Sequence, residues 1–332
     1  MEEENRPTRL KVRVDRVAAL TDRIKTFELS AIDGALPRFE AGAHIEVLTG
    51  IGVARSYSLA NDPAETHRYL IAVLREPQGV GSGWMHDDVS AGDLLNVMEP
   101  QNAFALDETA AEHLLIAGGI GITPILSMAH RLDAIGAPFR LLFCTRSAAE
   151  TPFAAELQQR FGERVTIHYD GGDPTRSFDL AALLRKRPVG AHVYVCGPRG
   201  MIQAVRSAAQ HWPAETVHFE IFASPSVGTS NAEAASVTPE TNNVPFEVQL
   251  SSTGQVFAIP ADRTILDVLI GAGLNVPYVC KEGWCGNCQL GLLGGCADHR
   301  DDVLSDEERA ANSAIHICVS RAARGERLIL DR

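Results

Sequence analysis

The sequence predicts a multidomain chain: an antiparallel β-barrel, then an α/β domain with a parallel sheet, then a small α+β domain. Three observations in the 332 residues predict this order. Short β segments fill the first third, strand and helix patterns alternate in the second, and a cysteine-rich loop interrupts a mixed pattern in the last. The expected ranges are 8–107, 108–222 and 244–332, with a linker over 223–243. Domains hold about 100–200 residues, so this chain has room for two or three.

The first region consists of short segments with β character. Glycine, proline and aspartate separate them, a spacing typical of a small antiparallel barrel or sandwich. The six segments read LKVRVDRV, IKTFELS, HIEVLTG, RSYSLA, RYLIAVLRE and DLLNVMEP.

The second region alternates between strand and helix patterns. The buried-strand run EHLLIAGG is followed by the helical pattern PILSMAHRLDAIG, and such alternation continues to TVHFEIF. Successive βα units predict a parallel sheet. We expect the helix at 151–162 to start with Thr151 as its cap and Pro152 in its first turn, and to end at Gly162.

The third region follows a small, polar and proline-spaced stretch, residues 223–243, which we interpret as a flexible linker. PFEVQL and QVFAI suggest a hairpin, and RTILDVLIGAG suggests an amphipathic helix. Ser305 and Glu308 have the spacing of a capping box. IHICV and RLIL predict two short strands at the end of the chain.

Composition excludes some classes of protein. The net charge of −12 argues against a nucleic-acid partner, because binding phosphates requires a basic surface. No apolar run reaches the roughly 18 residues of a membrane span, and the start MEEENRPTRL lacks the apolar core of a secretory signal. We therefore expect a cytoplasmic protein, whose seven cysteines do not form a disulfide framework.

Four of the cysteines have the spacing of a plant-type [2Fe–2S] site. Cys280, Cys285 and Cys288 share one loop, and Cys318 follows them in the chain. Gly283 and Gly286 let the backbone pass close to the cluster with its N–H groups toward sulfur. The alternative is a four-cysteine structural zinc site, although such sites usually pair two Cys-x2-Cys hairpins. Cys296 and His299 resemble half of a Rieske site, but the other half, Cys-x-His, is absent from the sequence.

Three further motifs point to flat or phosphorylated ligands. LLIAGGIGITPILSM has a strand, a glycine turn and a helix start, with Thr123 and Pro124 expected as cap and first helical residue, an arrangement that favours a pyrophosphate. YVCGPRGM ends another strand of the expected parallel sheet, at the edge where ligands bind in α/β folds. In RSYSLAND, Arg55 and Tyr57 share one strand face, where arginine can bind phosphate and tyrosine can cover a ring. Each motif alone also fits a purely structural role.

Together the motifs resemble one family over nearly the whole chain. RSYSLAND, AGGIGITPIL, VYVCGPRGM, VHFEIFAS, the cysteine loop, ADHRDDVLSDEE and CVSRA are similar to the phthalate dioxygenase reductases, which include vanillate demethylase reductases. That family lies within the ferredoxin–NADP reductase-like flavoproteins. The resemblance implies an FMN-binding barrel, an NADH-binding α/β domain and a C-terminal β-grasp ferredoxin domain, in that order.

The resemblance also implies the residues that bind each cofactor. One departure is the phosphate turn, where the family often reads GRGGS and this chain reads GVGSG within GVGSGW, residues 79–84. The implied FMN contacts are Arg55, Ser56, Tyr57, Ser58, Ala72, Val73, Leu74, Gly81, Ser82, Thr123 and Phe222. The implied NADH contacts are Gly119, Gly121, Cys196, Gly197 and Pro198, with Arg146 and Asp170 on the adenosine side. The implied iron ligands are Cys280, Cys285, Cys288 and Cys318.

These cofactors imply a function in electron transfer. A hydride carries two electrons and a [2Fe–2S] cluster accepts one, so a flavin between them can divide the pair. We expect electrons to pass from NADH through FMN and the cluster to a separate terminal Rieske-type oxygenase, which acts on an aromatic ring or removes an O-methyl group. The acidic stretch DHRDDVLSDEE is expected to help dock that partner. A stand-alone NADH-dependent flavin or ferric reductase is the alternative, and a zinc module without electron transfer is a third possibility.

Overall fold

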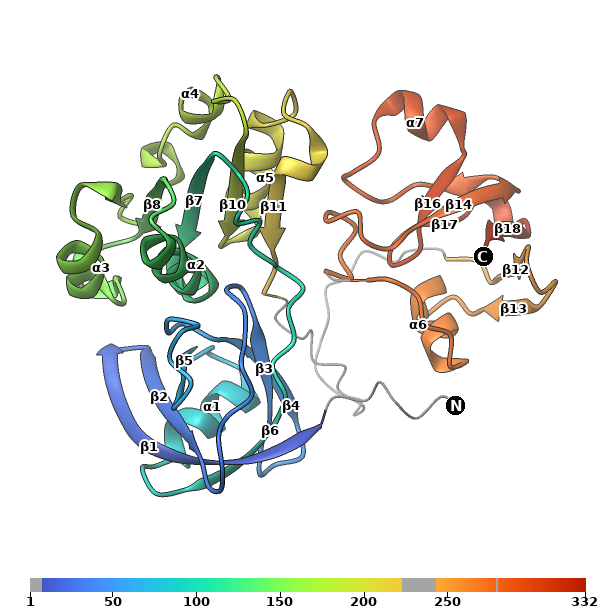
Figure 1. The fold of residues 1–332 in the computed structure, drawn as a ribbon. Coiled ribbons are helices and arrows are strands. Elements are labelled where there is room, and N and C mark those ends of the chain that lie inside the picture. The colour runs from blue at the N-terminus through green and yellow to red at the C-terminus, as the bar shows by residue number, and fades with distance from the viewer. Residues whose placement is uncertain (1–7, 223–242, 279) are drawn as a thin grey trace. The chain divides into compact units, whose positions relative to one another are not determined.

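The computed structural model describes residues 8–222, 243–278 and 280–332, and the chain divides into two units, Met1–Phe222 and Ala223–Arg332. Figure 1 shows the elements of both units in order along the chain. Most of the expected linker, residues 223–243, lies outside the described residues. Of the helices in the described part of the chain, none combines an apolar stretch with the length required to span a bilayer.

The first unit begins with a six-stranded antiparallel sheet, which matches the six β segments expected from the sequence. The strand order is β4-β3-β6-β1-β2-β5. A bridge between Leu59 and Ile71 connects the chain after β4 to β5, so the two edges of the sheet meet. Irregularities in β1 between Val14 and Arg16 bend that long strand. The strands are β1 Arg9–Thr21, β2 Ile24–Ala31, β3 His44–Leu48, β4 Ala54–Ser58, β5 Tyr69–Leu74 and β6 Leu94–Met98.

A helix replaces the turn that we expected at residues 79–84. The sequence GVGSGW opens helix α1, Val80–Asp87, which lies between β5 and β6 in the chain. The resemblance implied a turn here, yet Met85 is fully buried and packs into the core of the sheet. Burial of that side chain contributes about 1.5–3 kcal/mol, enough to offset the roughly 2 kcal/mol that two helical glycines cost.

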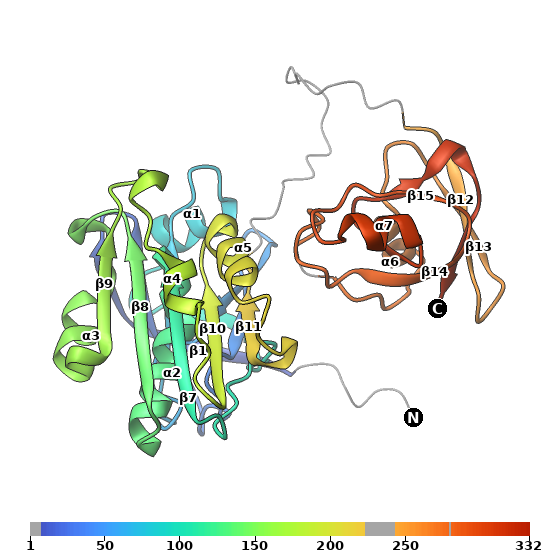
Figure 2. The same ribbon diagram turned by 90° about the horizontal axis from the view of Figure 1, so that it is seen from above.

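The second half of the first unit is a parallel sheet, as expected, and helices lie on both of its faces. The order is β11-β10-β7-β8-β9, and every pair is parallel. The strands are β7 Glu112–Gly118, β8 Phe139–Thr145, β9 Val165–Tyr169, β10 Ala191–Cys196 and β11 Val217–Glu220. Helices α2 Ile122–Ile135 and α3 Ala154–Phe161 lie on one face, and α4 Leu180–Leu184 and α5 Arg199–Ala208 on the other (Figures 1 and 2).

Two helix starts differ from the prediction. Helix α2 begins at Ile122 with Gly121 as its cap, so Thr123 lies inside the first turn. Helix α3 begins at Ala154 after Phe153, whose φ of 59° is left-handed, and the Thr151 hydroxyl instead donates to the Ser147 carbonyl. Gly162 ends α3 as predicted. Burial of Phe153, only 8% exposed, overrides the local cap signal of Thr151 and Pro152.

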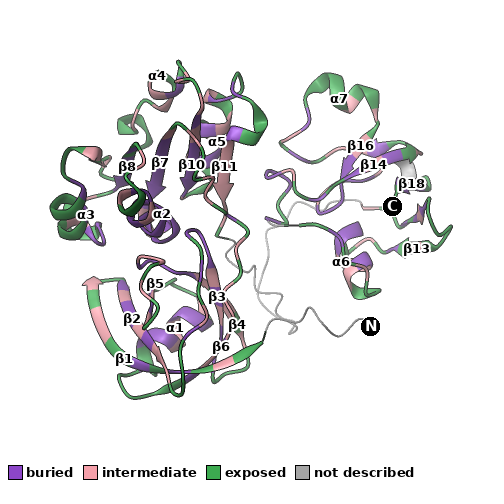
Figure 3. Cartoon of the chain, in the orientation of Figure 1, coloured by how far each residue is buried: buried purple, intermediate pink, exposed green. Residues whose placement is uncertain are grey.

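The two sheets of the first unit share a buried core. Ile24, Ala60 and Ala72 from the antiparallel part belong to the same apolar cluster as Ile122 and Tyr194 from the parallel part. The three central parallel strands, β7, β8 and β10, are buried along most of their length, as Figure 3 shows. This contact positions the ends of the parallel strands beside β4 and β5.

The second unit is a mixed five-stranded sheet with two short helices. The order is β13-β12-β18-β14-β16, from strands β12 Phe246–Leu250, β13 Val256–Ile259, β14 Gln289–Gly294, β16 Ala314–His316 and β18 Leu328–Asp331. Strands β15 Ala297–Asp298 and β17 Arg321–Ala322 form a separate pair. Helix α6, Ile265–Gly271, packs into the core, and α7, Asp306–Ala311, begins with the predicted capping box of Ser305 and Glu308.

Candidate functional site

The four predicted iron ligands come together in the second unit. Three of them follow α6 in the loop before β14, and Cys318 follows β16. Their exposures are 6% for Cys280, 4% for Cys285, 1% for Cys288 and 2% for Cys318. Because free thiols at four neighbouring buried positions have no packing advantage over apolar residues, their chemistry explains them better. Cys296, expected not to be a ligand, is exposed.

The thiols are arranged as two pairs. The sulfurs of Cys288 and Cys318 are 3.1 Å apart, and those of Cys280 and Cys285 lie within hydrogen-bonding reach of one another. Within the described residues, no three His, Cys, Asp or Glu side chains converge on one point suited to a single ion. Two thiolate pairs match a cluster of two irons, each of which takes two thiolates.

Backbone N–H groups of the loop face these sulfurs. The N–H of Glu282 donates to the Cys280 sulfur at 3.3 Å, and the N–H groups of Trp284 and Asn287 point toward Cys280 and Cys285 respectively. Such donors stabilise the negative charge of thiolates and of a cluster. The residues present therefore fit a [2Fe–2S] group.

Gly283 is required by the shape of the loop. Its φ is +77°, and a Cβ there would lie 2.5 Å from Cγ2 of Val319, next to Cys318. Gly286 also has a positive φ, +87°, but has more space. The loop therefore needs glycine at 283 both for its backbone conformation and for close approach to the Cys318 segment.

In the first unit, β4 brings its arginine to the start of α1. A Cβ at Gly81 would lie 2.7 Å from Cγ and 3.3 Å from Nε of Arg55, so the guanidinium stem rests against the first turn of the helix. A helix start presents N–H groups without intrahelical partners, and together with arginine it suits a phosphate. The Ser82 hydroxyl, in contrast, accepts from the Glu76 N–H and donates to the Gly79 carbonyl. Ser82 can therefore contribute its backbone more readily than its side chain.

Tyr57 lies two residues after Arg55 in β4, on the same face of the strand. Its hydroxyl is buried and has no hydrogen-bond partner within the described residues. Burial raises the pKa of Tyr57 to about 12, against a smaller opposing effect of Arg55. An orphaned phenol beside an arginine and a helix start fits a site for a flavin with its phosphate. Ser56, on the other strand face, is exposed.

The remaining residues expected to contact the flavin differ in burial and in the strand face on which they lie. On β5, Ala72 and Leu74 share one face, whereas the Val73 side chain is fully buried in the core of the antiparallel sheet. The Val73 carbonyl is also occupied, because Nε2 of His86 lies 2.9 Å from it. Thr123 is buried, and its hydroxyl donates to the Ile120 carbonyl, while Phe222, after β11, is 42% exposed.

The expected NADH residues meet where the strand order reverses. In the parallel sheet, chain order changes direction between β7 and β10, and α/β folds bind ligands at such a switch point. A Cβ at Gly121 would lie 2.3 Å from the Cys196 carbonyl oxygen, and one at Gly197 would lie 3.0 Å from Gly118 Cα. Pro198 caps α5, and Gly119 has a φ of +54° with open space around it. The glycine turn after β7 therefore contacts the glycine turn after β10, and the space beside Gly119 stays open.

Arg146 and Asp170 lie side by side at the same edge of the sheet. They follow β8 and β9, and the Gly171 N–H donates to the Arg146 carbonyl. The Asp170 carboxylate accepts from the Gly172 N–H at 2.7 Å. Their position at the carboxyl ends of β8 and β9 fits the predicted adenosine side of a dinucleotide.

Sequence reasoning missed Glu220. This residue ends β11 opposite Cys196 in the parallel register, and the Ser58 hydroxyl donates to its Oε2 at 3.5 Å. Burial raises the pKa of Glu220 to about 7, partly offset by the Ser58 hydrogen bond. Burial also raises the pKa of the Cys196 thiol, and the Glu220 carboxylate adds to that rise. A carboxylate inside the apolar run VHFEIF was the available signal.

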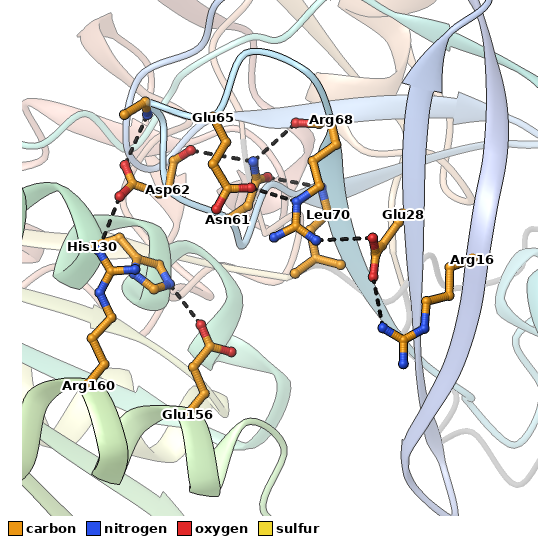
Figure 4. A network of polar contacts seen from close by, with 11 residues as sticks. Arg16, Glu28, Asn61, Asp62, Glu65, Arg68, Leu70, His130, Glu156 and Arg160 are labelled. Carbon is orange, nitrogen blue, oxygen red and sulfur yellow. Dashed lines mark hydrogen bonds and ion pairs between the residues drawn. The ribbon is translucent and has the colours of Figure 1, made fainter.

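Polar contacts also connect the two sheets of the first unit. Arg160 of α3 bridges Asp62, in the loop after β4, and Asp133 of α2, each at 3.3 Å. Figure 4 shows the contact between Arg160 and Asp62 beside the pair of His130 and Glu156. Exposed ion pairs contribute only about 0–1 kcal/mol each, so the shared apolar core must supply most of the contact energy.

Strand ends that suit a flavin and a dinucleotide, together with a two-iron thiolate site in the same chain, define an iron–sulfur flavoprotein oxidoreductase. The profile of the 2Fe-2S iron-sulfur cluster binding domain matches residues 248–323, and that of the N-terminal domain of dimethylamine monooxygenase subunit DmmA-like proteins matches 98–216. The chain is 44% identical to phthalate dioxygenase reductase of Burkholderia cepacia over 97% of both chains. It is 41% identical to the tert-butanol monooxygenase / tert-amyl alcohol desaturase reductase subunit of Aquincola tertiaricarbonis, over 98% of this chain and 96% of that one.

A solved structure has the same modular architecture. It is that of a phthalate dioxygenase reductase, described as a modular structure for electron transfer from pyridine nucleotides to [2Fe–2S]. It is 43% identical, covers 98% of both chains and has a TM-score of 0.65. The chain belongs to the phthalate dioxygenase reductase family.

Proposed function

We propose that this chain is the reductase component of a two-component oxygenase. Electrons pass from NADH through FMN to the [2Fe–2S] cluster and on to a separate terminal oxygenase of the Rieske type. The observation that carries the proposal is the presence of the four paired, buried thiols in the same chain as the glycine turns that meet at the ends of β7 and β10. A cluster that accepts single electrons explains why a flavin must divide the hydride pair.

The proposal assigns a part of the chain to each cofactor. The antiparallel sheet over residues 8–107 acts as the flavin barrel, with Arg55 and the start of α1 at the phosphate and Tyr57 beside the ring. Residues 108–222 bind NADH at the switch point of the parallel sheet. Residues 244–332 form the β-grasp ferredoxin domain, and 223–243 link it to the rest.

Ser58, Cys196 and Glu220 belong to the proposed hydride-transfer site. They come from β4, β10 and β11, and the Ser58–Glu220 hydrogen bond joins the antiparallel and parallel parts. NADH supplies the hydride and FMN accepts it. The chain's own contribution is to exclude water from this pocket and to hold a carboxyl group that gains or loses its proton close to neutral pH.

The substrate of the whole system is bound by the partner in this proposal. An aromatic substrate fits the resemblance to phthalate and vanillate systems, but a similar relative is named for tert-butanol and tert-amyl alcohol. The reductase chain therefore does not decide the substrate class. We further propose a cytoplasmic location, in keeping with cysteines that stay reduced.

The acidic start of α7 is the proposed docking site for the oxygenase. Four acidic residues of this segment are exposed: Asp302, Asp306, Glu307 and Glu308. The segment is attached to the cluster loop, because the Asp302 N–H donates to the Gly283 carbonyl at 2.8 Å. A cluster of negative charge attracts a basic surface and orients it beside the iron site.

A direct test compares the wild-type chain with Cys318→Ser under anaerobic conditions. NADH is expected to bleach the flavin in both proteins, while reduction of cytochrome c, a one-electron acceptor, falls sharply in the variant. A stand-alone flavin or ferric reductase would deliver electrons to that acceptor equally well in both. That result would reject the proposed route through the cluster.

A further inference from the structure

Asp301 is a buried carboxylate in a stretch of otherwise exposed acidic residues. It is 2% exposed, whereas its neighbours at 302, 305, 306, 307 and 308 are exposed. A buried carboxylate costs folding free energy unless its oxygens are satisfied. The groups that contact the Asp301 carboxylate therefore indicate its role.

Both carboxylate oxygens of Asp301 have partners. Oδ2 accepts the N–H groups of Val303 at 3.1 Å and Leu304 at 2.9 Å. Oδ1 accepts the Ser320 hydroxyl at 3.4 Å and lies 3.3 Å from Nδ1 of His316, and both of these side chains are buried. His316 and Ser320 lie on either side of Cys318, two residues away in each direction.

These contacts connect three segments around the cluster site. Asp301 joins the start of the acidic stretch to the turn that carries Cys318. The next residue, Asp302, joins the stretch to the cysteine loop through its N–H bond to Gly283. Arg309 of α7 closes the arrangement by donating to the Asp301 carbonyl at 2.5 Å. The proposed docking segment is thus attached to both parts of the iron site.

The charge of Asp301 also acts on the site. Its Oδ1 contacts His316 and Ser320, the residues two positions before and after Cys318, so its negative charge opposes further negative charge at the nearby cluster site. Burial would raise the pKa of Asp301, but the N–H groups of Leu304 and Val303 and the nearby His316 lower it below its ordinary value. Since a buried charge is screened far less than an exposed one, its effect on a nearby redox centre persists in salt.

We propose that Asp301 is a positioning residue of the iron–sulfur site, whose buried negative charge beside the Cys288–Cys318 pair lowers the reduction potential of the cluster. It also fixes the acidic docking segment to the turn that carries Cys318, a role that rests on the proposed function. An electron added to the cluster increases its negative charge, so a fixed carboxylate nearby opposes reduction.

The test is a mediated redox titration of the holoprotein, followed by the EPR signal of the reduced cluster. Asp301→Asn is expected to shift the midpoint potential upward, and Asp301→Glu to restore it toward the wild-type value. Asp306→Asn is the matched control, because it removes the same charge from an exposed position in the same segment. It is expected to leave the potential unchanged.

A second variant covers the case in which Asp301→Asn fails to assemble a cluster. Ser320→Ala keeps the carboxylate but removes a donor that partly compensates its charge, so the potential is expected to move in the opposite direction, downward. Equal potentials in Asp301→Asn and Asp306→Asn, or a wild-type potential in Ser320→Ala, would overturn the proposal. The titration uses chemical reductants, so its result does not depend on NADH, on the flavin or on a partner, and it fails separately from the proposed function.

Discussion

The hydroxyl of Ser58 donates to Oε2 of Glu220 across a separation of 162 residues, at 3.5 Å. One residue ends a strand of the antiparallel sheet and the other ends the edge strand of the parallel sheet. The bond therefore lies where the proposed flavin and nicotinamide sites adjoin. Glu220 is therefore placed to respond to charge changes where the two proposed sites adjoin.

The rate of flavin reduction by NADH is expected to rise between about pH 6 and pH 8. The raised pKa of Glu220, about 7, means that its carboxyl is neutral at the lower end and ionised at the upper end. A carboxylate stabilises the positive charge that develops on a nicotinamide as hydride leaves. Stopped-flow rates across this range in wild type and Glu220→Gln test this idea. The variant should be slower by roughly 10²-fold at high pH and lose the pH dependence; an unchanged profile would argue against a role for Glu220.

Replacement of Arg55 is expected to weaken FMN binding. The guanidinium rests against the start of α1, and a charge-assisted hydrogen bond contributes about 1.5–3 kcal/mol, equivalent to roughly 10–100-fold in affinity. Arg55→Lys should recover part of the loss, because lysine keeps the charge without the planar fork. Fluorescence titration of the deflavinated protein measures both variants. Equal affinity in Arg55→Ala and wild type would remove Arg55 from the phosphate site.

Gly283→Ala is expected to reduce cluster incorporation. Its Cβ would lie 2.5 Å from Val319, and its backbone has a φ of +77°. Gly254→Ala is the control, because Gly254 has a similar φ of +71° in the same unit but open space around it. Iron and sulfide content per chain should fall much further at 283 than at 254. If the two variants lost the cluster equally, backbone strain alone, and not close approach to the Cys318 segment, would explain the glycine.

Salt is expected to slow electron delivery to the oxygenase without slowing flavin reduction. The charges at the start of α7 are exposed. At an ionic strength of about 0.1–0.15 M, salt screens the attraction between exposed charges that are more than about 8–10 Å apart. Double replacement of Asp306 and Glu307 by their amides should lower the low-salt rate and remove most of its salt dependence. Measurements with the cognate oxygenase decide this, and a parallel salt effect on both steps would speak against docking by charge.

The sequence predicted most elements because their signals are local. The six β segments, the βα alternation and the Ser305–Glu308 cap depend on residues within a few positions of each other. Where long-range packing competes with a local signal, the prediction was wrong. Thr151 and Pro152 look like a helix start, yet the buried Phe153 places the start at Ala154. The resemblance implied a turn at GVGSGW, yet Gly81 and Gly83 lie in helix α1, whose Met85 is buried in the core.

The same reasoning explains what was missed in the site. The spacing of the cysteines specifies their chemistry without a fold, because three of the ligands share one loop. Glu220 and Asp301 could not be singled out in this way. Glu220 acquires its role from the pairing of β10 with β11 and from Ser58, 162 positions away. Asp301 is distinguished from the acidic residues around it only by burial against His316 and Ser320.

The most direct measurement is the EPR spectrum of the NADH-reduced protein, taken together with its iron, sulfide, zinc and flavin content. The proposed function predicts two irons and two sulfides per chain, with the signal of a reduced two-iron cluster at about one spin per chain. Zinc in place of iron, or a reduced flavin with no cluster signal after NADH is added, would contradict it.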